Sequence, residues 1–133
     1  MASSRDTVIL DAVARLAAET PGLDVLLIFG SRARGDTHDG SDWDFGFLAS
    51  DVFDPAWFLG ALVERVGSDH VDLVDLRRAG GLLRYRAARD GRPLHEARPG
   101  LVDQFRLQAV DFWCDVGPLL QRGYDDVLAE LKK

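Results

Sequence analysis

Cysteine is almost missing from the sequence, which excludes a fold held together by internal disulfides. Cys114 is the only cysteine among 133 residues, so no intramolecular pair can form, and a reducing compartment is expected. Long apolar runs are missing too: no stretch could span a bilayer, and the first residues, MASSRDT, lack the apolar core of a signal peptide. We therefore expect a cytoplasmic protein with no membrane partner.

An excess of positive charge is also lacking. The 16 lysines and arginines are outnumbered by 22 aspartates and glutamates, giving a formal net charge of −6. An acidic protein repels the phosphate backbone of nucleic acids unless its basic residues are clustered. The one arginine-rich zone, LRRAGGLLRYRAARDGR, also carries acidic and apolar residues. We therefore expect no extended nucleic-acid binding, whereas a single nucleotide held through a metal ion stays compatible with the charge.

The hydrophobic pattern predicts one domain, residues 1–133, of the α/β or α+β class with a small sheet. The composition, 47% hydrophobic and 29% charged, is that of an ordinary globular chain. Helical spacing and strand alternation predict helices over residues 3–22, 54–67 and 79–91, strands over 24–29, 41–49 and 70–76, and a short extended piece over 93–95.

The C-terminal part, residues 100–131, is predicted to be helical. Phe105, Phe112 and Trp113 recur there at helical spacing. Gly117-Pro118 is expected to break or kink the helix, because proline removes a backbone donor and clashes one turn back. The aromatic side chains either cover the sheet or, where other helices already cover it, form an interface with a partner or a second copy.

Two aspartates in the stretch SDWDFGFLA predict a metal site. Asp42 and Asp44 lie two residues apart on the predicted strand and therefore project from one face, while Trp43 points to the other. Two carboxylates this close resist ionising together, and a divalent cation removes that repulsion. Two metal ions held by such carboxylates can polarise a phosphoryl group. Gly46, next on the same face, is expected to leave room there. The alternative interpretation is a solvated hairpin loop followed by an ordinary amphipathic strand.

The turn that follows the apolar run VLLIF predicts a phosphate site. Gly30 and Ser31 come directly after this strand and open a helical turn, where free backbone N–H groups and a serine hydroxyl bind anions. Glycine also lets the backbone approach a phosphate closely. Arg32 or Arg34 could reach the phosphates, and a surface or loop-clamping role for these arginines stays equally open.

A third carboxylate is expected from the strand HVDLVDL. Asp72 is flanked by Val71 and Leu73, which face the opposite side, so its carboxylate can leave an apolar layer from mid-strand. We assign Asp72 as the third metal ligand and as a candidate base for an attacking hydroxyl. Asp75, near the strand end, is expected to be a cap rather than a ligand.

The stretch GSRARGDTHDGSDWDFGF resembles the GSxxRG…SDxDF signature of the DNA polymerase β-like nucleotidyltransferases. With the first helix, the strand VDLVDL and the segment LRYRAARDGRPLHE, the resemblance is closest to the minimal nucleotidyltransferase subfamily, over residues 8–96. It implies a nucleotidyltransferase fold: a small mixed sheet flanked by helices, with a helical tail over residues 100–131. It also implies ATP as donor, two Mg²⁺ ions on Asp42, Asp44 and Asp72, and a nucleotide-binding set of Gly30, Ser31 and Arg34.

The resemblance implies a function as well. Minimal nucleotidyltransferases often transfer AMP to a tyrosine of a HEPN-domain toxin and thereby act as antitoxins, which leaves a homo- or hetero-oligomer open. Two alternatives remain at this point. One is nucleotidyl transfer to a small hydroxylated compound such as an aminoglycoside, for which the chain lacks a second enclosing domain. The other is an antitoxin that works by binding alone, with a vestigial site.

Four further side chains with reactive atoms have no assigned role in this interpretation. His38 and His70 lie in polar, loop-like contexts without the clustered partners of a zinc site, so both are expected to be solvated. His95 is unassigned. Cys114 lies in an apolar helical stretch and is expected to be a packed core thiol.

Overall fold

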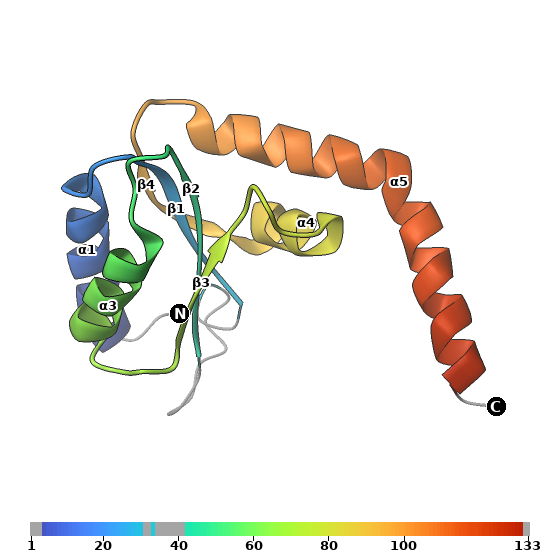
Figure 1. Cartoon of the computed structure of the whole chain (residues 1–133), viewed down its shortest axis with the longest axis horizontal. Helices are drawn as coiled ribbons and strands as arrows, with labels where there is room; N and C mark the ends of the chain where they lie inside the picture. Colours follow the sequence, from blue (N-terminus) through green and yellow to red (C-terminus); the bar gives the residue numbers. More distant parts are fainter. Residues whose placement is uncertain (1–3, 31–32, 34–41, 132–133) are drawn as a thin grey trace.

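A computed structural model describes residues 4–30, 33 and 42–131 of the chain. Its helices and strands follow one another along the chain as Figure 1 shows, and β1 and β2 are consecutive among the described elements. They are α1 (Ser4–Ala18), β1 (Leu23–Phe29), β2 (Trp43–Ala49), α3 (Pro55–Val66), β3 (Val71–Asp75), α4 (Gly81–Asp90), β4 (Arg92–Glu96) and α5 (Leu101–Leu131).

One four-stranded sheet organises the domain, in the order β3-β2-β1-β4. Strand β1 pairs antiparallel with both β2 and β4, whereas β2 and β3 run parallel, so the sheet is mixed, as expected. The central position of β1 explains its continuous apolar run, because both of its faces are covered: residues 25–28 are all fully buried.

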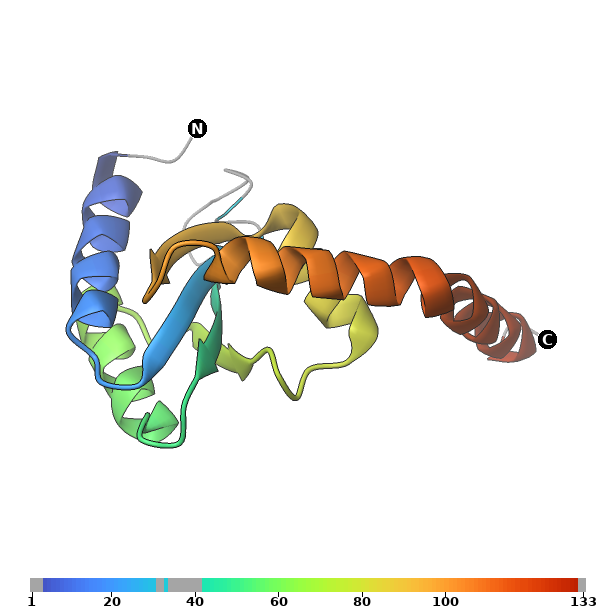
Figure 2. The same ribbon diagram turned by 90° about the horizontal axis from the view of Figure 1, so that it is seen from above.

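Helices cover both faces of the sheet. Helices α1 and α3 lie on one face, and α4 with the first part of α5 lies on the other (Figures 1 and 2). Strand β2 divides its side chains accordingly. Trp43, Phe45 and Phe47 enter the core beneath α1 and α3, so the opposite face carries Asp44 and Gly46.

Local signals set the ends of helix α3 as the sequence predicts. The carboxylate of Asp54 accepts a hydrogen bond from the N–H of Trp57 at 3.2 Å, and Pro55 occupies the first turn. The helix ends at Gly67, whose φ of +77° is left-handed and whose N–H donates to the Val63 carbonyl at 2.9 Å.

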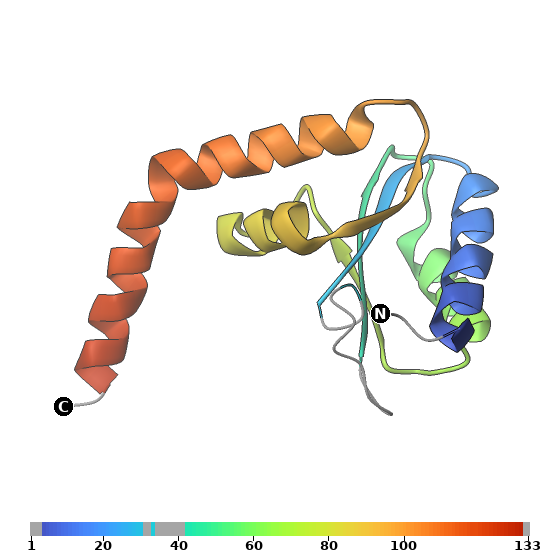
Figure 3. The same ribbon diagram turned by 180° about the vertical axis from the view of Figure 1, so that it is seen from behind.

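Helix α5 is continuous through Gly117-Pro118, so of the break or kink that the sequence predicted the structure has only the kink (Figure 1). The ribbon changes direction about halfway along, and its second half extends away from the sheet (Figures 1 and 3). No helix in the described part of the chain has the length and apolarity required to cross a membrane.

Only the first turns of α5 act as a cover for the sheet. Phe105 is 2% exposed, whereas Phe112 is 51% exposed and Trp113 stacks on Tyr85 of α4 with ring centroids 5.4 Å apart. The expectation that Cys114 is a packed core thiol is wrong: Cys114 is exposed, because α5 lies over α4 rather than over the sheet at that point.

Gly46 does not leave room at the metal site, contrary to the expectation from sequence. It is buried in mid-strand, and a Cβ built there would lie 2.9 Å from three carbon atoms of the fully buried Leu76. The missing side chain therefore makes space for Leu76, which follows β3 and donates its N–H to the Phe47 carbonyl at 3.0 Å. Gly46 is a packing requirement of the core.

Gly46→Ala should destabilise the protein by about 1–3 kcal/mol, because an added methyl overpacks a closed core. Gly60→Ala is the matched control: Gly60 lies on α3 with nothing within 4 Å of its built Cβ, and the change should stabilise by about 0.5–1 kcal/mol. Chemical denaturation measures both. If Leu76 is the obstacle, Gly46→Ala/Leu76→Ala should cost less than the sum of its single changes; strict additivity would contradict this packing account.

Candidate active site

The parallel pairing of β2 with β3 places two of the predicted ligands side by side. Asp44 and Asp72 are direct register partners, and paired strands lie about 4.8 Å apart. Asp42 stands immediately before β2, at the same edge of the sheet. The starts of β2 and β3 thus bring three carboxyl groups together from separate parts of the chain.

Electrostatics show that these carboxyl groups affect one another. Asp44 is partly buried while Asp42 and Asp72 are exposed. The pKa of Asp44 is raised above its ordinary value of 3.8, first by desolvation and then by the negative charges of Asp72 and Asp42. The site therefore holds a carboxyl group whose ionised form is disfavoured by its surroundings and would be favoured by a nearby positive charge.

Gly30, which directly follows β1, lies against the carboxylate of Asp44. It follows Phe29, the register partner of Asp44, and its φ of +76° lies in the left-handed region that favours glycine. A Cβ built on Gly30 would lie 2.6 Å from the Asp44 Oδ2 atom. Glycine is required here both by the backbone turn and by the space that the Asp44 carboxylate occupies.

His70 is a site neighbour whose place the sequence reasoning missed. Its side chain is 64% exposed, as expected, yet its Nδ1 atom lies 3.4 Å from the Asp42 Oδ1 atom. The cause is the register: Trp43 pairs with Val71, and the Trp43 N–H donates to the His70 carbonyl at 2.8 Å. His70 and Asp42 are therefore equivalent positions, each just before one of two parallel strands. Aligning SDWD with DHVD would have revealed the pair.

Four other residues were assigned from the sequence, and the structure describes one of them. Ser31 and Arg34, predicted to bind nucleotide with Gly30, lie outside the described residues, as does Arg32. Asp75 is a strand-end cap, as predicted: its Oδ1 accepts the Arg77 N–H at 2.9 Å, and its carbonyl accepts two further N–H groups of the following turn.

The donor set fits Mg²⁺, because carboxylate oxygens are the ligands that this ion prefers. Within residues 4–30, 33 and 42–131, however, no three acidic, histidine or cysteine side chains already form a metal cage. The carboxylate of Asp42, which is 60% exposed, lies 3.4 Å from the Nδ1 atom of His70 instead. Exposed side chains change readily between staggered rotamers.

Comparison with known families agrees with this geometry. The family described as polymerase beta, nucleotidyltransferase matches residues 12–99, which include Gly30, Asp42, Asp44 and Asp72. The chain belongs to this polymerase β nucleotidyltransferase family. The expected fold class and the enzyme class, a nucleotidyltransferase, are confirmed with it.

Two curated relatives in the nucleotidyltransferase family are protein adenylyltransferases. MntA from Aphanizomenon flos-aquae is 32% identical over 109 residues, covering 72% of this chain and 72% of that protein. MntA from Shewanella oneidensis is 30% identical over 111 residues, covering 82% of this chain and 79% of that protein. The resemblance to minimal nucleotidyltransferases is thereby confirmed.

Solved structures give the same relationship over almost the whole chain. A toxin-antitoxin structure with AMP-PNP has a TM-score of 0.72 at 28% identity and covers 95% of this chain and 99% of that one. A complex of tri-AMPylated Shewanella oneidensis HEPN toxin with MNT antitoxin has a TM-score of 0.71 at 25% identity, covering 92% and 98%. The likeness includes the long C-terminal helix, which the family match over residues 12–99 does not reach.

Gly30→Ala should separate the two roles of this glycine. A left-handed alanine costs about 1–2 kcal/mol, and the new methyl also displaces the Asp44 carboxylate. Gly67→Ala is the matched control, since Gly67 has φ +77° with nothing within 4 Å of its built Cβ. Both variants should lose similar stability in metal-free buffer, but Mg²⁺ should raise the melting temperature only of Gly67→Ala and the unmodified protein. An equal Mg²⁺ response in both variants would refute the contact's importance for metal binding.

Asp44→Asn should stabilise the metal-free protein at neutral pH. Because the folded-state pKa of Asp44 is raised, ionising this group opposes folding, and the penalty appears as the pH rises above 3.8. Thermal melts in EDTA should show the variant a few degrees more stable at pH 7 and equal to the unmodified protein near pH 3. Asp51→Asn, at an exposed turn beyond the far end of β2, should leave the melting temperature unchanged. A gain for Asp44→Asn that persists below pH 3.8 would contradict charge repulsion as its cause.

Proposed function

We propose that this chain is a Mg²⁺-dependent protein adenylyltransferase that transfers AMP from ATP to a tyrosine hydroxyl of a HEPN-domain toxin and so acts as its antitoxin. The observation that carries the proposal is the register pairing of Asp44 with Asp72, beside the glycine turn at the end of β1. This arrangement supports the proposal, because the carboxylates that would hold metal lie next to the glycine turn that would hold phosphate. Both parts are needed to move a nucleotidyl group.

The relatives support the proposal of a protein as acceptor and ATP as donor. The two curated relatives are protein adenylyltransferases, and the solved neighbours include a toxin-antitoxin structure with AMP-PNP and an antitoxin complex with a tri-AMPylated HEPN toxin.

Each site residue has a role in the proposed transfer. Asp42, Asp44 and Asp72 would hold two Mg²⁺ ions, which when bound neutralise the charge on the triphosphate. Gly30, Ser31 and Arg34 would hold the triphosphate itself. The acceptor oxygen attacks the α-phosphorus, the bond from that phosphorus to the bridging oxygen breaks, and pyrophosphate leaves. Asp72 is more exposed than its register partner Asp44, and it takes the proton of the acceptor hydroxyl.

The raised pKa of Asp44 links ion binding to this chemistry. Partial burial and two neighbouring carboxylates raise the pKa of Asp44 and so disfavour its ionised form. Binding of a divalent cation reverses that balance, so the ionised form of Asp44 and the bound metal stabilise each other. The strength of Mg²⁺ binding should accordingly increase with pH through the range in which Asp44 titrates.

Incubation with ATP, Mg²⁺ and a HEPN-domain toxin should add AMP-sized mass increments to that toxin, measured by intact mass spectrometry. Asp42→Ala/Asp44→Ala should lower the rate at least about 100-fold, since even outer-shell partners of metal ligands are worth 10–100-fold. Asp51→Ala removes one carboxylate beyond the far end of β2 and should retain the full rate.

The same experiment separates the alternatives. Toxin neutralisation that persists in the double variant, with no mass increment in any sample, would replace transfer by neutralisation through binding. An increment that appears on an aminoglycoside added to the mixture, and not on the protein, would move the acceptor to small molecules.

A further inference from the structure

A polar cavity lies on the face of the sheet that α4 and α5 cover. Its volume is about 380 Å³, which falls within the range of small-ligand sites. Its polar lining comes from β1, from the turn after β3, from α4, and from the start of α5 with the loop before it. The polar residues are Asp24, Arg77, Arg84, Arg98, Gln104 and Gln108.

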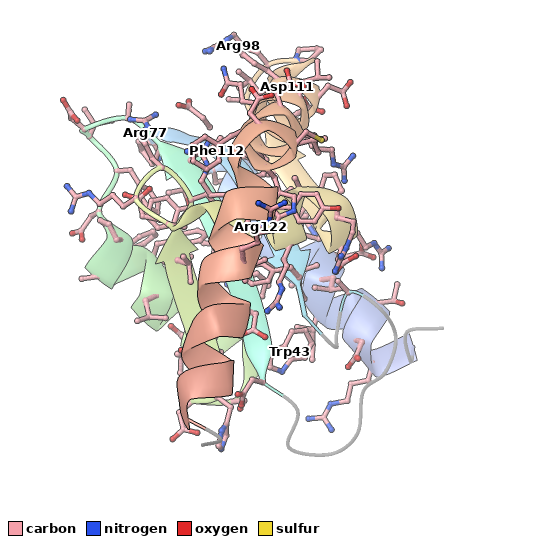
Figure 4. All side chains as sticks on the ribbon, turned by 90° about the vertical axis from the view of Figure 1, so that its right-hand side faces the viewer. Trp43, Arg77, Arg98, Asp111, Phe112 and Arg122 are labelled. Carbon is pink, nitrogen blue, oxygen red and sulfur yellow. The ribbon has the colours of Figure 1, made fainter. Side chains whose placement is uncertain are left out.

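This cavity is separate from the candidate active site. Its floor includes Val25 and Leu48, which are register partners, and Leu48 is four residues along β2 from Asp44, or roughly 13 Å at about 3.3 Å per residue. The buried side chain of Leu76, packed over Gly46, fills the space between them. In Figure 4, Arg77 and Arg98 lie at one end of the domain and Trp43, beside the candidate metal ligands, lies at the other.

Three arginines line the cavity: Arg77, Arg84 and Arg98. In the described part of the chain, none of the three forms an ion pair. The Arg84 guanidinium lies over the Phe105 ring at 5.7 Å, and its Nε atom is buried with no hydrogen-bond partner among the described residues. A buried donor left unpaired is costly, so a ligand that accepts its hydrogen bond would be favoured.

The charge of the lining selects the ligand class. Three guanidinium groups and the single carboxylate of Asp24 give a formal charge of +2, within a chain whose net charge is −6. A phosphate dianion matches this charge, whereas a lone carboxylate would leave half of it uncompensated. The planar fork of arginine suits phosphate oxygens, and the amides of Gln104 and Gln108 can supply further donors.

We propose that this cavity is a second, metal-independent anion site that binds a phosphate dianion. The phosphate group can belong to inorganic phosphate, to pyrophosphate or to a nucleoside monophosphate, all of which present the same oxygens to the arginines. The site does not depend on the proposed adenylyl transfer, because none of its lining residues belongs to the candidate active site.

Titration of the ¹⁵N-labelled full chain tests the proposal by NMR. Sodium phosphate, sodium pyrophosphate and AMP are added separately, in EDTA and at constant ionic strength. At least one probe should cause saturable shifts at amides around the cavity, such as those of Arg98, Leu101 and Gln104. Arg77→Gln/Arg98→Gln should weaken that binding about 10–100-fold, the range expected for hydrogen bonds to charged groups. Both arginines are exposed, so the fold should survive.

The control is Arg78→Gln/Arg86→Gln, which makes the same charge change at exposed arginines that do not line the cavity. This control should bind the probe as the unmodified protein does. Shifts with AMP alone would identify a nucleotide as the source of the phosphate, and shifts with the inorganic anions alone would identify free phosphate. The proposal is overturned by shifts confined to the surroundings of Asp44, by equal weakening in both double variants, or by no saturable shift with any probe.

Discussion

Mutual repulsion among the carboxyl groups of Asp42, Asp44 and Asp72 is the constraint around which this domain is built. Isolated carboxylates would simply move apart in water. The parallel ladder between β2 and β3 prevents this, because it fixes Asp44 opposite Asp72 and one side of Asp44 is withdrawn from solvent. The backbone hydrogen bonds of the sheet thus hold like charges in an arrangement that a divalent cation can stabilise.

The sheet can hold this arrangement because its other face is strongly packed. Trp43, Phe45 and Phe47 alternate with the site residues along β2 and are buried beneath α1 and α3, with Phe47 and Phe53 in ring contact at 4.9 Å. A shift of β2 by one residue would bring these aromatic rings to the site face and the carboxylates into the core, so the register is strongly fixed. The position of the proposed metal ligands therefore depends on aromatic side chains that are buried in the core.

The sequence was sufficient for features that depend on periodicity and capping. The apolar run of β1 indicated a central strand, and Asp54-Pro55 located the start of α3. It was insufficient wherever the outcome depends on which strands pair. The neighbourhood of His70 and Asp42 follows from the parallel β2–β3 register, and the role of Gly46 follows from Leu76, thirty residues later. Neither partner is visible from local spacing, because each lies on a different element.

The closest contacts of the candidate site lie at one end of the two inner strands. A partly buried carboxyl group with a raised pKa and a left-handed glycine in contact with it both lie where β1 ends and β2 begins. Like charges held together at a single site are stable only when the surrounding structure over-determines their positions. Here β1 is paired on both sides and covered on both faces, so the strand that leads into Gly30 is held firmly in place. That constraint explains why the glycine turn can sit against Asp44 without being displaced by it.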